Sequence, residues 1–358
     1  MTKRSDFIYR SSLFLIMVTA VVVGIGNAVR ADVENKDIPK AVKTNDTLKL
    51  IPNTTPREPK LEFDWPALYI GTAWYEEGPT GCTVFYFPDQ ARTVADVRGG
   101  NHASLLMDNM ENGRSDYLDA ICFAGGSIFG LEAIAGVNAE LLAKGGYANR
   151  VYKTSGAIIW DLWRNNMIYP DKELGRAAMR AVRPGAFPMG WQGVGCSPGC
   201  GGGFGAEATG EGGAFRQIGP TKIAVFTVVN AWGAIVDRTG RVVRGNLDKK
   251  TGKRLSSLEC VEKQISDQTK AESRSNNTTL TLVVTNQKVS NLYQFARQVH
   301  TSMARAIQPF HTIHDGDILY AATTEEIENK KLDDVSLGIL ASELAWDAVL
   351  ETLSDIKQ

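Results

Sequence analysis

A threonine that follows a polar stretch and begins a buried strand is the feature of this sequence best suited to chemistry. The polar stretch ends at Asn276-Asn277, and Thr278 opens the apolar run TTLTLVVTN. A threonine hydroxyl is a weak nucleophile at neutral pH and needs a base within hydrogen-bond distance. If the chain is cut before Thr278, the new α-amine, with an ordinary pKa of about 7.7–8.0, supplies that base. The sequence therefore fits a hydrolase that cleaves itself between Asn277 and Thr278, although β-propensity alone also produces a Thr-Thr pair at a strand start.

Two other groups of residues offer competing chemistry. Gly195-Cys196-Ser197-Pro198-Gly199 matches the GxSxG pattern of serine hydrolases, but glycine-rich flanks replace the strand and helix that this pattern needs. His311, His314, Asp315 and Asp317 are residue types that bind metals, yet this spacing is weaker than a helical HExxH. We predict no metal and no cofactor, and take Asp315-Gly316-Asp317 on its own as an ordinary turn.

Glycines and cysteines suggest further positions near a pocket. The Gly125-Gly126-Ser127 turn leads into a helix, and its N–H groups could bind an anion or allow close packing. We interpret it as structural or as a pocket wall. Cys196 and Cys200 could form a local disulfide or remain free thiols, and the sequence does not choose between them.

The elements that must position these residues mix strands and helices. Strands are expected at 67–75, 83–87, 117–124, 158–162, 222–230, 278–286 and 317–322, with a hairpin at 233–244. Helices are expected from 128 to beyond 142, and at 171–181, 291–307 and 335–353. Without strict alternation of strand and helix, this order predicts an α+β layered fold.

Three segments of the chain differ from the rest in composition. Residues 1–31 have a basic start, a short apolar run and small residues at the end, as in a secretory signal peptide, with a membrane anchor as the alternative. Residues 32–60 are polar and proline-rich and predict a flexible arm. Residues 246–277 are charged and predict an exposed connector. The chain has 358 residues with 39 basic and 40 acidic ones, and this balance indicates no nucleic-acid partner.

Several long motifs in one order give the chain a specific resemblance. They are YEEGPTG (75–81), FAGGSIFGLEA (123–133), IYPDKELGRAA (168–178), VDRTGRVVRGN (236–246), NTTLTLVVTN (277–286) and QPFHTIHDGDILYAATT (308–324). From about Phe63 onward the sequence resembles the P1 (DmpA-type) aminopeptidase family, and within it the enzymes that cut nylon oligomers.

The resemblance implies a fold, an activity and an assembly. The fold is a four-layer αββα arrangement of the N-terminal-nucleophile type (DmpA-like). A larger chain, 61–277 within the hydrolase domain, and a smaller chain, 278–358, stay associated after self-cleavage and form homo-oligomers, with a tetramer implied. The implied substrate is a linear oligoamide of the 6-aminohexanoate (nylon) type or a short peptide. An aminopeptidase, a D-amino-acid amidase or an esterase is the family's alternative, and an inactive solute-binding or structural relative is the non-enzymatic one.

The resemblance also assigns roles to residues. Thr278 is the nucleophile, Asn230 stabilises the oxyanion, and Asp315 and Asp317 orient the nucleophile. One family feature is missing: the stretch Gly193–Gly210 contains no lysine, where nylon-oligomer hydrolases carry a catalytic one. Cys200 or a neighbouring glycine takes that place, which makes Cys200 a candidate pocket residue.

Overall fold

The computed structural model describes residues 42–268 and 277–355. The predicted signal peptide (1–31) and residues 32–41 of the predicted arm lie outside the described residues. The chain divides into residues 1–42 and 43–358, and every described helix and strand belongs to the second unit. Among the described residues, no helix combines the length and the hydrophobicity needed to span a membrane.

One long strand, β4 (Thr80–Val97), joins two halves of a ten-stranded sheet in the described part of the chain. Residues 80–86 of β4 pair with β3, and residues 92–97 pair with β21. The strands of the first half are β3 (Tyr69–Tyr75), β5 (Ser104–Leu105), β6 (Asp116–Ala124), β7 (Thr154–Ile158) and β9 (Arg183–Pro184). Those of the second half are β13 (Glu211–Ile218), β14 (Thr221–Asn230), β19 (Thr278–Gln287) and β21 (Ile318–Ile327).

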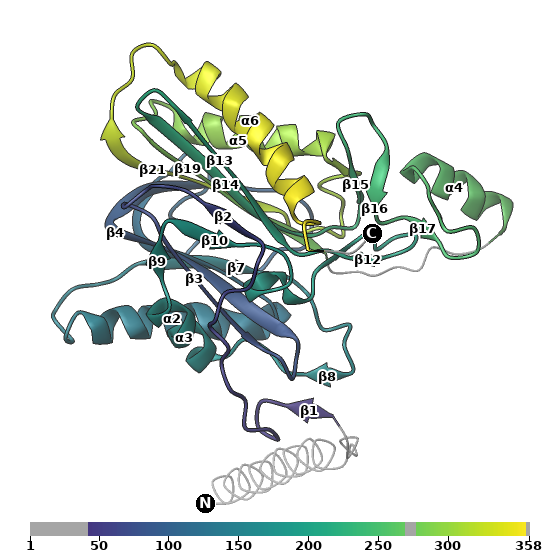
Figure 1. Cartoon of the computed structure of the whole chain (residues 1–358), viewed down its shortest axis with the longest axis horizontal. Coiled ribbons are helices and arrows are strands. Elements are labelled where there is room, and N and C mark those ends of the chain that lie inside the picture. The colour runs from purple at the N-terminus through teal and green to yellow at the C-terminus, as the bar shows by residue number, and fades with distance from the viewer. Residues whose placement is uncertain (1–41, 269–276, 356–358) are drawn as a thin grey trace, which may run out of the picture. The chain divides into compact units, whose positions relative to one another are not determined.

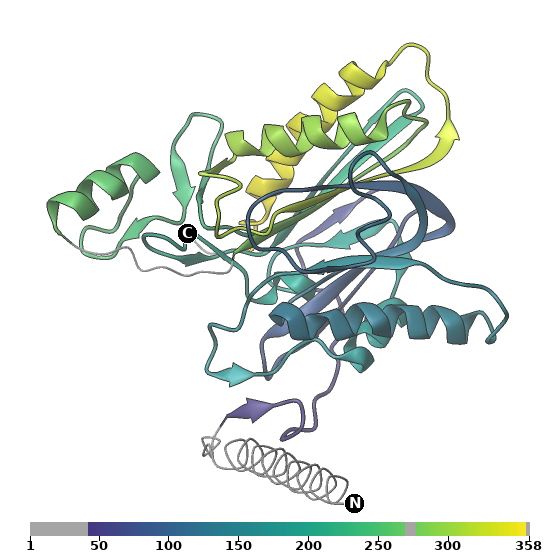
Figure 2. The same cartoon turned by 180° about the vertical axis from the view of Figure 1, so that it is seen from behind.

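Helices cover the outer face of each half, as Figures 1 and 2 show from opposite sides. The first half carries α2 (Leu131–Lys144) and α3 (Lys172–Arg180), and the second carries α5 (Leu292–Ser302) and α6 (Asp334–Glu351). Three buried hydrophobic clusters lie between these layers, and the middle one includes Phe85, Phe123 and Phe226 from both halves. The α+β class and the expected order of helix, sheet, sheet and helix are therefore confirmed.

The strand that begins at Thr278 lies in the centre of the second half. It pairs antiparallel with β14 and parallel with β21, and every one of its residues is buried. Leu280, Leu282 and Val284 face the cluster between the sheets, while Val283 faces the helices. A strand covered on both faces needs the nearly continuous apolar sequence that made this one predictable.

Shorter elements complete the described fold. Besides β5 and β9, the described two-residue and three-residue strands are β1 (Lys43–Thr44), β2 (Lys60–Glu62), β8 (Asn166–Met167), β10 (Ala186–Pro188), β11 (Gly199–Cys200), β12 (Glu207–Ala208), β15 (Ala234–Val236), β16 (Val242–Arg244), β17 (Leu247–Asp248), β18 (Lys253–Arg254) and β20 (Ile307–Gln308). The 3₁₀ turns are η1 (Ser127–Gly130), η2 (Gly193–Cys196) and η3 (Met303–Arg305). The expected hairpin is confirmed as β15 and β16.

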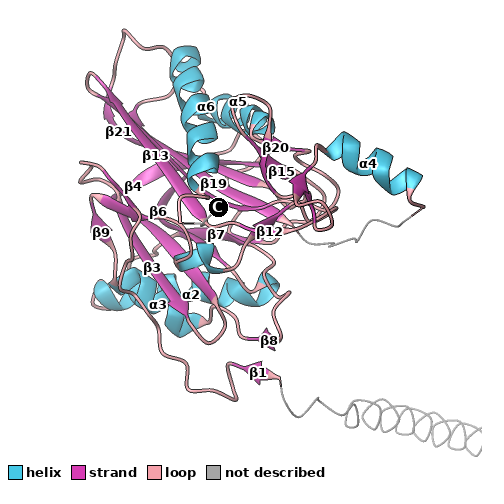
Figure 3. Ribbon diagram, turned by 45° about the vertical axis from the view of Figure 1, so that its right-hand side comes forward, coloured by secondary structure: helices cyan, strands magenta, loops and turns pink. Residues whose placement is uncertain are grey.

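Three expectations need correction. The strand expected at 158–162 is wrong, because β7 ends at Ile158 and a loop follows. The arm is not loose where it is described, since Asn53 pairs with Trp74 and Asn45 bonds to the backbone of Tyr169. The connector contains the helix α4 (Ser257–Ser266), which begins with a capping box and projects away from both sheet layers in Figure 3.

Candidate active site

Strand register brings the predicted nucleophile and the predicted oxyanion donor together. In the antiparallel pair of β14 and β19, Asn230 lies directly opposite Thr278. On the other side, Asn277 forms a parallel bridge with Asp315, just before β21 begins. Asn230, Asn277, Thr278, Asp315 and Asp317 therefore form one buried cluster, in which no residue is more than 5% exposed.

The peptide bond between Asn277 and Thr278 is intact and held by hydrogen bonds. The Thr278 hydroxyl donates to the Asn277 carbonyl oxygen over 2.6 Å. The same oxygen accepts the Gly316 N–H over 2.8 Å, and the Asn277 N–H donates to the His314 carbonyl over 2.9 Å. The hydroxyl oxygen thus lies beside the carbonyl group that it would attack.

The Asn230 amide is fixed on both sides. Its oxygen accepts the Gly199 N–H over 3.1 Å, and its nitrogen donates to the Trp160 carbonyl over 2.9 Å. These contacts define which way the amide points. One of the two hydrogens on Nδ2 has no partner among the described residues, so it remains free to bind a carbonyl oxygen in the site.

Asp315 and Asp317 hold backbone groups around the predicted nucleophile. Asp317 Oδ1 accepts the Thr279 N–H over 2.7 Å, and Asp315 Oδ1 accepts the Trp232 N–H over 2.9 Å. Burial raises the pKa of both carboxyls to about 6, and for Asp315 the nearby Asp317 adds repulsion. In this uncleaved chain, within the part that the structure describes, neither carboxylate bonds directly to the Thr278 hydroxyl. Both carboxylates reach Thr278 only through the residues beside it.

A pair of histidines lies behind Asp317, and the sequence did not identify them as its partners. His311 Nδ1 lies 2.9 Å from Asp317 Oδ2, and the His311 ring contacts the His300 ring at 4.5 Å between centroids. Burial and the Arg98 cation lower the pKa of His311 to about 4. His311 is therefore neutral at neutral pH, and it donates from Nδ1 to the ionised carboxylate.

A cavity of about 510 Å³, counting its open mouth, reaches the cluster. Among the described residues, its lining contains two tryptophans and one acidic residue: Trp160, Trp163, Pro198, Gly199, Gly202, Ala206, Glu207, Ala208, Asn230 and Asn277. Glu207 is already paired, because Arg254 donates to both of its oxygens at 2.7 and 2.9 Å. Burial opposes ionisation, but the Arg254 bond holds the pKa of Glu207 below its usual range. The described lining thus combines apolar side chains, including both tryptophans, with amide groups at the end nearest Thr278.

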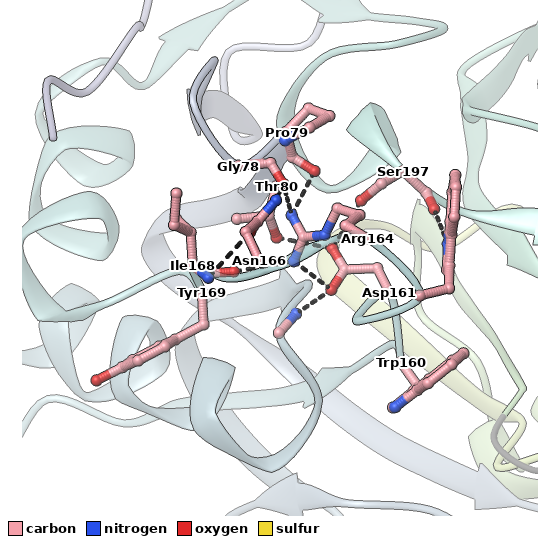
Figure 4. Close-up of polar contacts among 12 residues, drawn as sticks. Gly78, Pro79, Thr80, Trp160, Asp161, Arg164, Asn166, Ile168, Tyr169 and Ser197 are labelled. Carbon is pink, nitrogen blue, oxygen red and sulfur yellow. Dashed lines mark hydrogen bonds and ion pairs between the residues drawn. The ribbon is translucent and has the colours of Figure 1, made fainter. Parts of the chain in front are cut away.

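A buried carboxylate, Asp161, ties the cavity walls together (Figure 4). Its oxygens accept the Gly126 N–H, the Thr80 hydroxyl and the Ser197 hydroxyl, each over 2.7 Å. Arg164 completes the set at 3.1 Å, and both side chains are at most 5% exposed. Trp160 and Trp163 lie on the same loop. The sequence signal was an aspartate inside the apolar run IIWDLW, which we interpreted as a strand.

Two of the predicted pocket elements lie elsewhere. Gly125, Gly126 and Ser127 do not line the cavity: the Gly126 N–H binds Asp161, and the Ser127 N–H binds the Ile159 carbonyl. Cys200 is fully buried among core residues such as Val229, and burial raises the pKa of its thiol to about 12. The interpretation of these residues as pocket walls is therefore corrected: the glycine turn supports the Asp161 loop, and Cys200 packs in the core.

The competing residues also have definite environments. The Ser197 hydroxyl donates to Asp161 and contacts no histidine in the described structure, so Ser197 lacks the base that a serine nucleophile needs. All five cysteines are free, which answers the question left open for Cys196 and Cys200. Within residues 42–268 and 277–355, no three His, Cys, Asp or Glu side chains are grouped as metal ligands.

Comparisons with known proteins find relatives of this chain. The model of peptidase family S58 matches residues 64–356. The 6-aminohexanoate-oligomer endohydrolases of Paenarthrobacter ureafaciens and of an Agromyces strain are 44% and 43% identical to this chain, and each match covers 86% of this chain and 90% of the relative. An uncharacterised aminopeptidase of Mycobacterium leprae is 31% identical, covering 76% of this chain and 78% of the relative.

Solved structures support the same fold. A β-aminopeptidase of a Burkholderia species superposes with a TM-score of 0.57 at 15% identity, covering 80% of this chain and 84% of that one. The L-aminopeptidase D-Ala-esterase/amidase of Ochrobactrum anthropi, described as a variant of the Ntn hydrolase fold, gives 0.56 at 15% identity with the same coverage. At this level of identity the likeness concerns the fold alone.

Proposed function

The chain belongs to peptidase family S58, and we propose that it is a self-processing hydrolase that cuts amide bonds in linear oligoamides or short peptides. One observation carries the proposal. The Thr278 hydroxyl lies 2.6 Å from the carbonyl oxygen of the preceding residue, and Asn230 stands opposite it at the end of a cavity.

Self-processing begins with attack by the threonine on its own chain. The Thr278 oxygen bonds to the Asn277 carbonyl carbon, the peptide C–N bond breaks, and the nitrogen leaves with the hydroxyl proton as an amine. Water then hydrolyses the resulting ester, so that Asn277 ends in a carboxylate and Thr278 regains its hydroxyl. The cut turns a buried backbone nitrogen into an α-amine adjacent to the nucleophile.

Turnover uses the groups that this cut creates. The α-amine of Thr278 accepts the hydroxyl proton as the oxygen attacks a substrate carbonyl, and later returns it to the leaving amine. The Asn230 amide donates its free hydrogen to the oxyanion, and its contacts with Gly199 and Trp160 hold it in place without reorganisation. In this proposal the α-amine is the general base, because it is created next to the hydroxyl whose proton it must accept.

The proposed substrates are oligomers of 6-aminohexanoate. Two relatives at 43–44% identity are named as endohydrolases of these oligomers. Trp160 and Trp163 give the cavity broad apolar walls, which suit a polymethylene chain better than a charged side chain. The family's other activities, on N-terminal residues of peptides, D-amino-acid amides and esters, form the alternative.

A panel of substrates separates these activities. Hydrolysis of 6-aminohexanoate oligomers should exceed hydrolysis of D-alanine amide, of a matched ester and of a dipeptide when kcat/KM is compared. A higher kcat/KM for the dipeptide would replace the oligoamide proposal with an aminopeptidase. A chain that remains whole and hydrolyses nothing would favour the non-enzymatic relative.

Export and assembly belong to the same proposal. We propose that residues 1–31 direct the protein out of the cytoplasm and are then removed, with a retained membrane anchor as the alternative. We also propose a homo-oligomer. Helix α4 exposes Leu258, Val261 and Ile265 to solvent, which supports a contact with another copy. N-terminal sequencing of the secreted protein and light scattering of the purified protein test the two statements separately.

Thr278→Ala tests self-processing, because it removes the hydroxyl. This variant should remain a single chain on a denaturing gel, whereas wild type should give fragments that meet between Asn277 and Thr278. Thr279→Ala is the matched control, because its hydroxyl does not bond to the scissile carbonyl, and it should still be processed. A processed Thr278→Ala chain would exclude Thr278 as the nucleophile.

A further inference from the structure

The oxygen of the scissile carbonyl already has a backbone donor. It accepts the Gly316 N–H over 2.8 Å, in addition to the Thr278 hydroxyl. When the hydroxyl attacks, negative charge develops on this oxygen, which moves little as the carbonyl carbon becomes tetrahedral. An N–H group at about 2.7–3.1 Å from such an oxygen is what an oxyanion hole provides.

We propose that the Gly316 N–H is the oxyanion donor of self-cleavage, a catalytic role separate from that of Asn230 in turnover. The inference rests on the proposed self-processing of the chain. Both tetrahedral intermediates, the one formed by attack of Thr278 and the one formed when water attacks the ester, carry their charge on the former Asn277 carbonyl oxygen. Gly316 stabilises that oxygen in each.

Asn230 does not serve this oxygen in the uncleaved chain. Its amide nitrogen donates to the Trp160 carbonyl and its amide oxygen accepts from Gly199, and Asn230 makes no bond to the Asn277 carbonyl in the described structure. Its remaining hydrogen is available to a carbonyl that enters from the cavity. Self-cleavage and turnover therefore have different donors for their oxyanions.

Hydrogen bonds between two backbone segments, 98–101 and 315–317, hold the Gly316 N–H in place. The Asn101 N–H donates to the Asp315 carbonyl over 3.0 Å, and the Arg98 N–H donates to the Asp317 carbonyl over 2.8 Å. A Cβ atom on Gly316 would lie 2.1 Å from the Asn101 carbonyl oxygen, and one on Gly99 would lie 2.2 Å from the Asp315 carbonyl oxygen. Only glycine at both positions allows the two segments to approach this closely, and the donor is therefore oriented before the reaction starts.

The Asp315 side chain holds the same turn from the other side. Its Oδ2 accepts the Thr312 N–H over 2.9 Å and the Thr312 hydroxyl over 2.5 Å, while Oδ1 accepts from Trp232. Thr312 touches no reacting atom. In this proposal it is a positioning residue, which acts on self-cleavage through Asp315 and Gly316.

Replacing Gly316 by glycolic acid tests the proposal, because it exchanges the N–H for an ester oxygen and changes no side chain. The full-length chain is made by nonsense suppression, and cleavage is followed on denaturing gels after synthesis. Self-cleavage should slow by about 10²–10³-fold, while kcat per processed chain stays close to wild type. The same replacement at Gly190, whose buried N–H donates to the Glu211 carbonyl over 2.7 Å, is the control and should leave the cleavage rate unchanged.

The outcomes distinguish this inference from the proposal beneath it. A wild-type chain that stays whole would overturn self-processing and the Gly316 role together. If wild type is cleaved and the Gly316 ester variant is cleaved equally fast, the Gly316 role alone is overturned. The same conclusion follows if the ester variant loses self-cleavage and turnover to the same extent. If the ester variant does not fold, Thr312→Val and Thr312→Ser decide. Thr312→Val should slow cleavage more than turnover, and Thr312→Ser should restore the cleavage rate. A Thr312→Val chain that is cleaved as fast as wild type would reject the proposal.

Discussion

The buried carboxylate of Asp161 allows a quantitative prediction about stability. It accepts three hydrogen bonds of 2.7 Å and forms an ion pair of 3.1 Å with Arg164. Both side chains are at most 5% exposed, so solvent does not screen the pair. Removing one partner of a buried ion pair leaves an uncompensated charge and costs about 3–5 kcal/mol. We expect this loss in the free energy of unfolding for Asp161→Ala.

The measurement needs one covalent chain in every sample. All variants are therefore made in a Thr278→Ala background, and the free energy of unfolding is taken from urea titrations. Asp116→Ala is the control, because its partner Lys153 is 39% exposed and such pairs contribute at most about 1 kcal/mol.

The KM of the processed enzyme gives a second test of this network. In the processed enzyme, Asp161→Asn should raise KM for an oligoamide, because the loop that carries Trp160 and Trp163 loses its anchor. An Asp161→Ala chain that is no less stable than the Asp116→Ala control would refute the reasoning about this network.

Three further predictions concern other buried polar groups. Asn230→Ala should lower kcat of the processed enzyme by about 10²–10³-fold with little change in KM, and an unchanged kcat in steady-state assays would remove Asn230 from catalysis. Self-cleavage of wild type should slow as the pH falls through about 6, because protonation of Asp317 weakens its bond to the Thr279 N–H; a rate that stays constant from about pH 5 to pH 8 in a gel time course would contradict this. Burial raises the pKa of Glu211 well above its usual range. Above about pH 4.3 the native state therefore keeps a proton on Glu211 that the unfolded state has released, and the free energy of unfolding falls as the pH rises. Glu211→Gln should remove that slope in urea titrations at several pH values, and a mutant less stable than its parent at neutral pH would count against a protonated Glu211.

Much of the fold could be predicted because its buried strands have nearly continuous apolar sequences. The run that begins at Thr278 is apolar since the strand is covered on both faces, and Lys222 to Asn230 is apolar for the same reason. The loop after β7 was mistaken for a strand because IIWDLW is equally apolar. Its hydrophobic residues flank a buried ion pair, and no local pattern shows that Asp161 meets Arg164, Thr80 and Ser197.

The site was predictable only in part. Thr278 and Asn230 are neighbours through strand pairing, which a resemblance can transfer from one chain to another. Cys200 was misplaced because its position along the chain says nothing about which way its side chain points. The Gly316 N–H was not foreseen either. It belongs to the backbone, and its orientation depends on contacts with residues 98–101, far away in the sequence.

The central claim is that the chain severs its own Asn277–Thr278 bond and thereby creates its catalytic amine. Intact-mass analysis of purified wild type, with N-terminal sequencing of the smaller fragment, tests it most directly. Two masses that sum to the protein plus one water, with a fragment beginning Thr278-Thr279-Leu280, are the predicted result. A single mass that spans the junction in a preparation that hydrolyses amides would contradict the account.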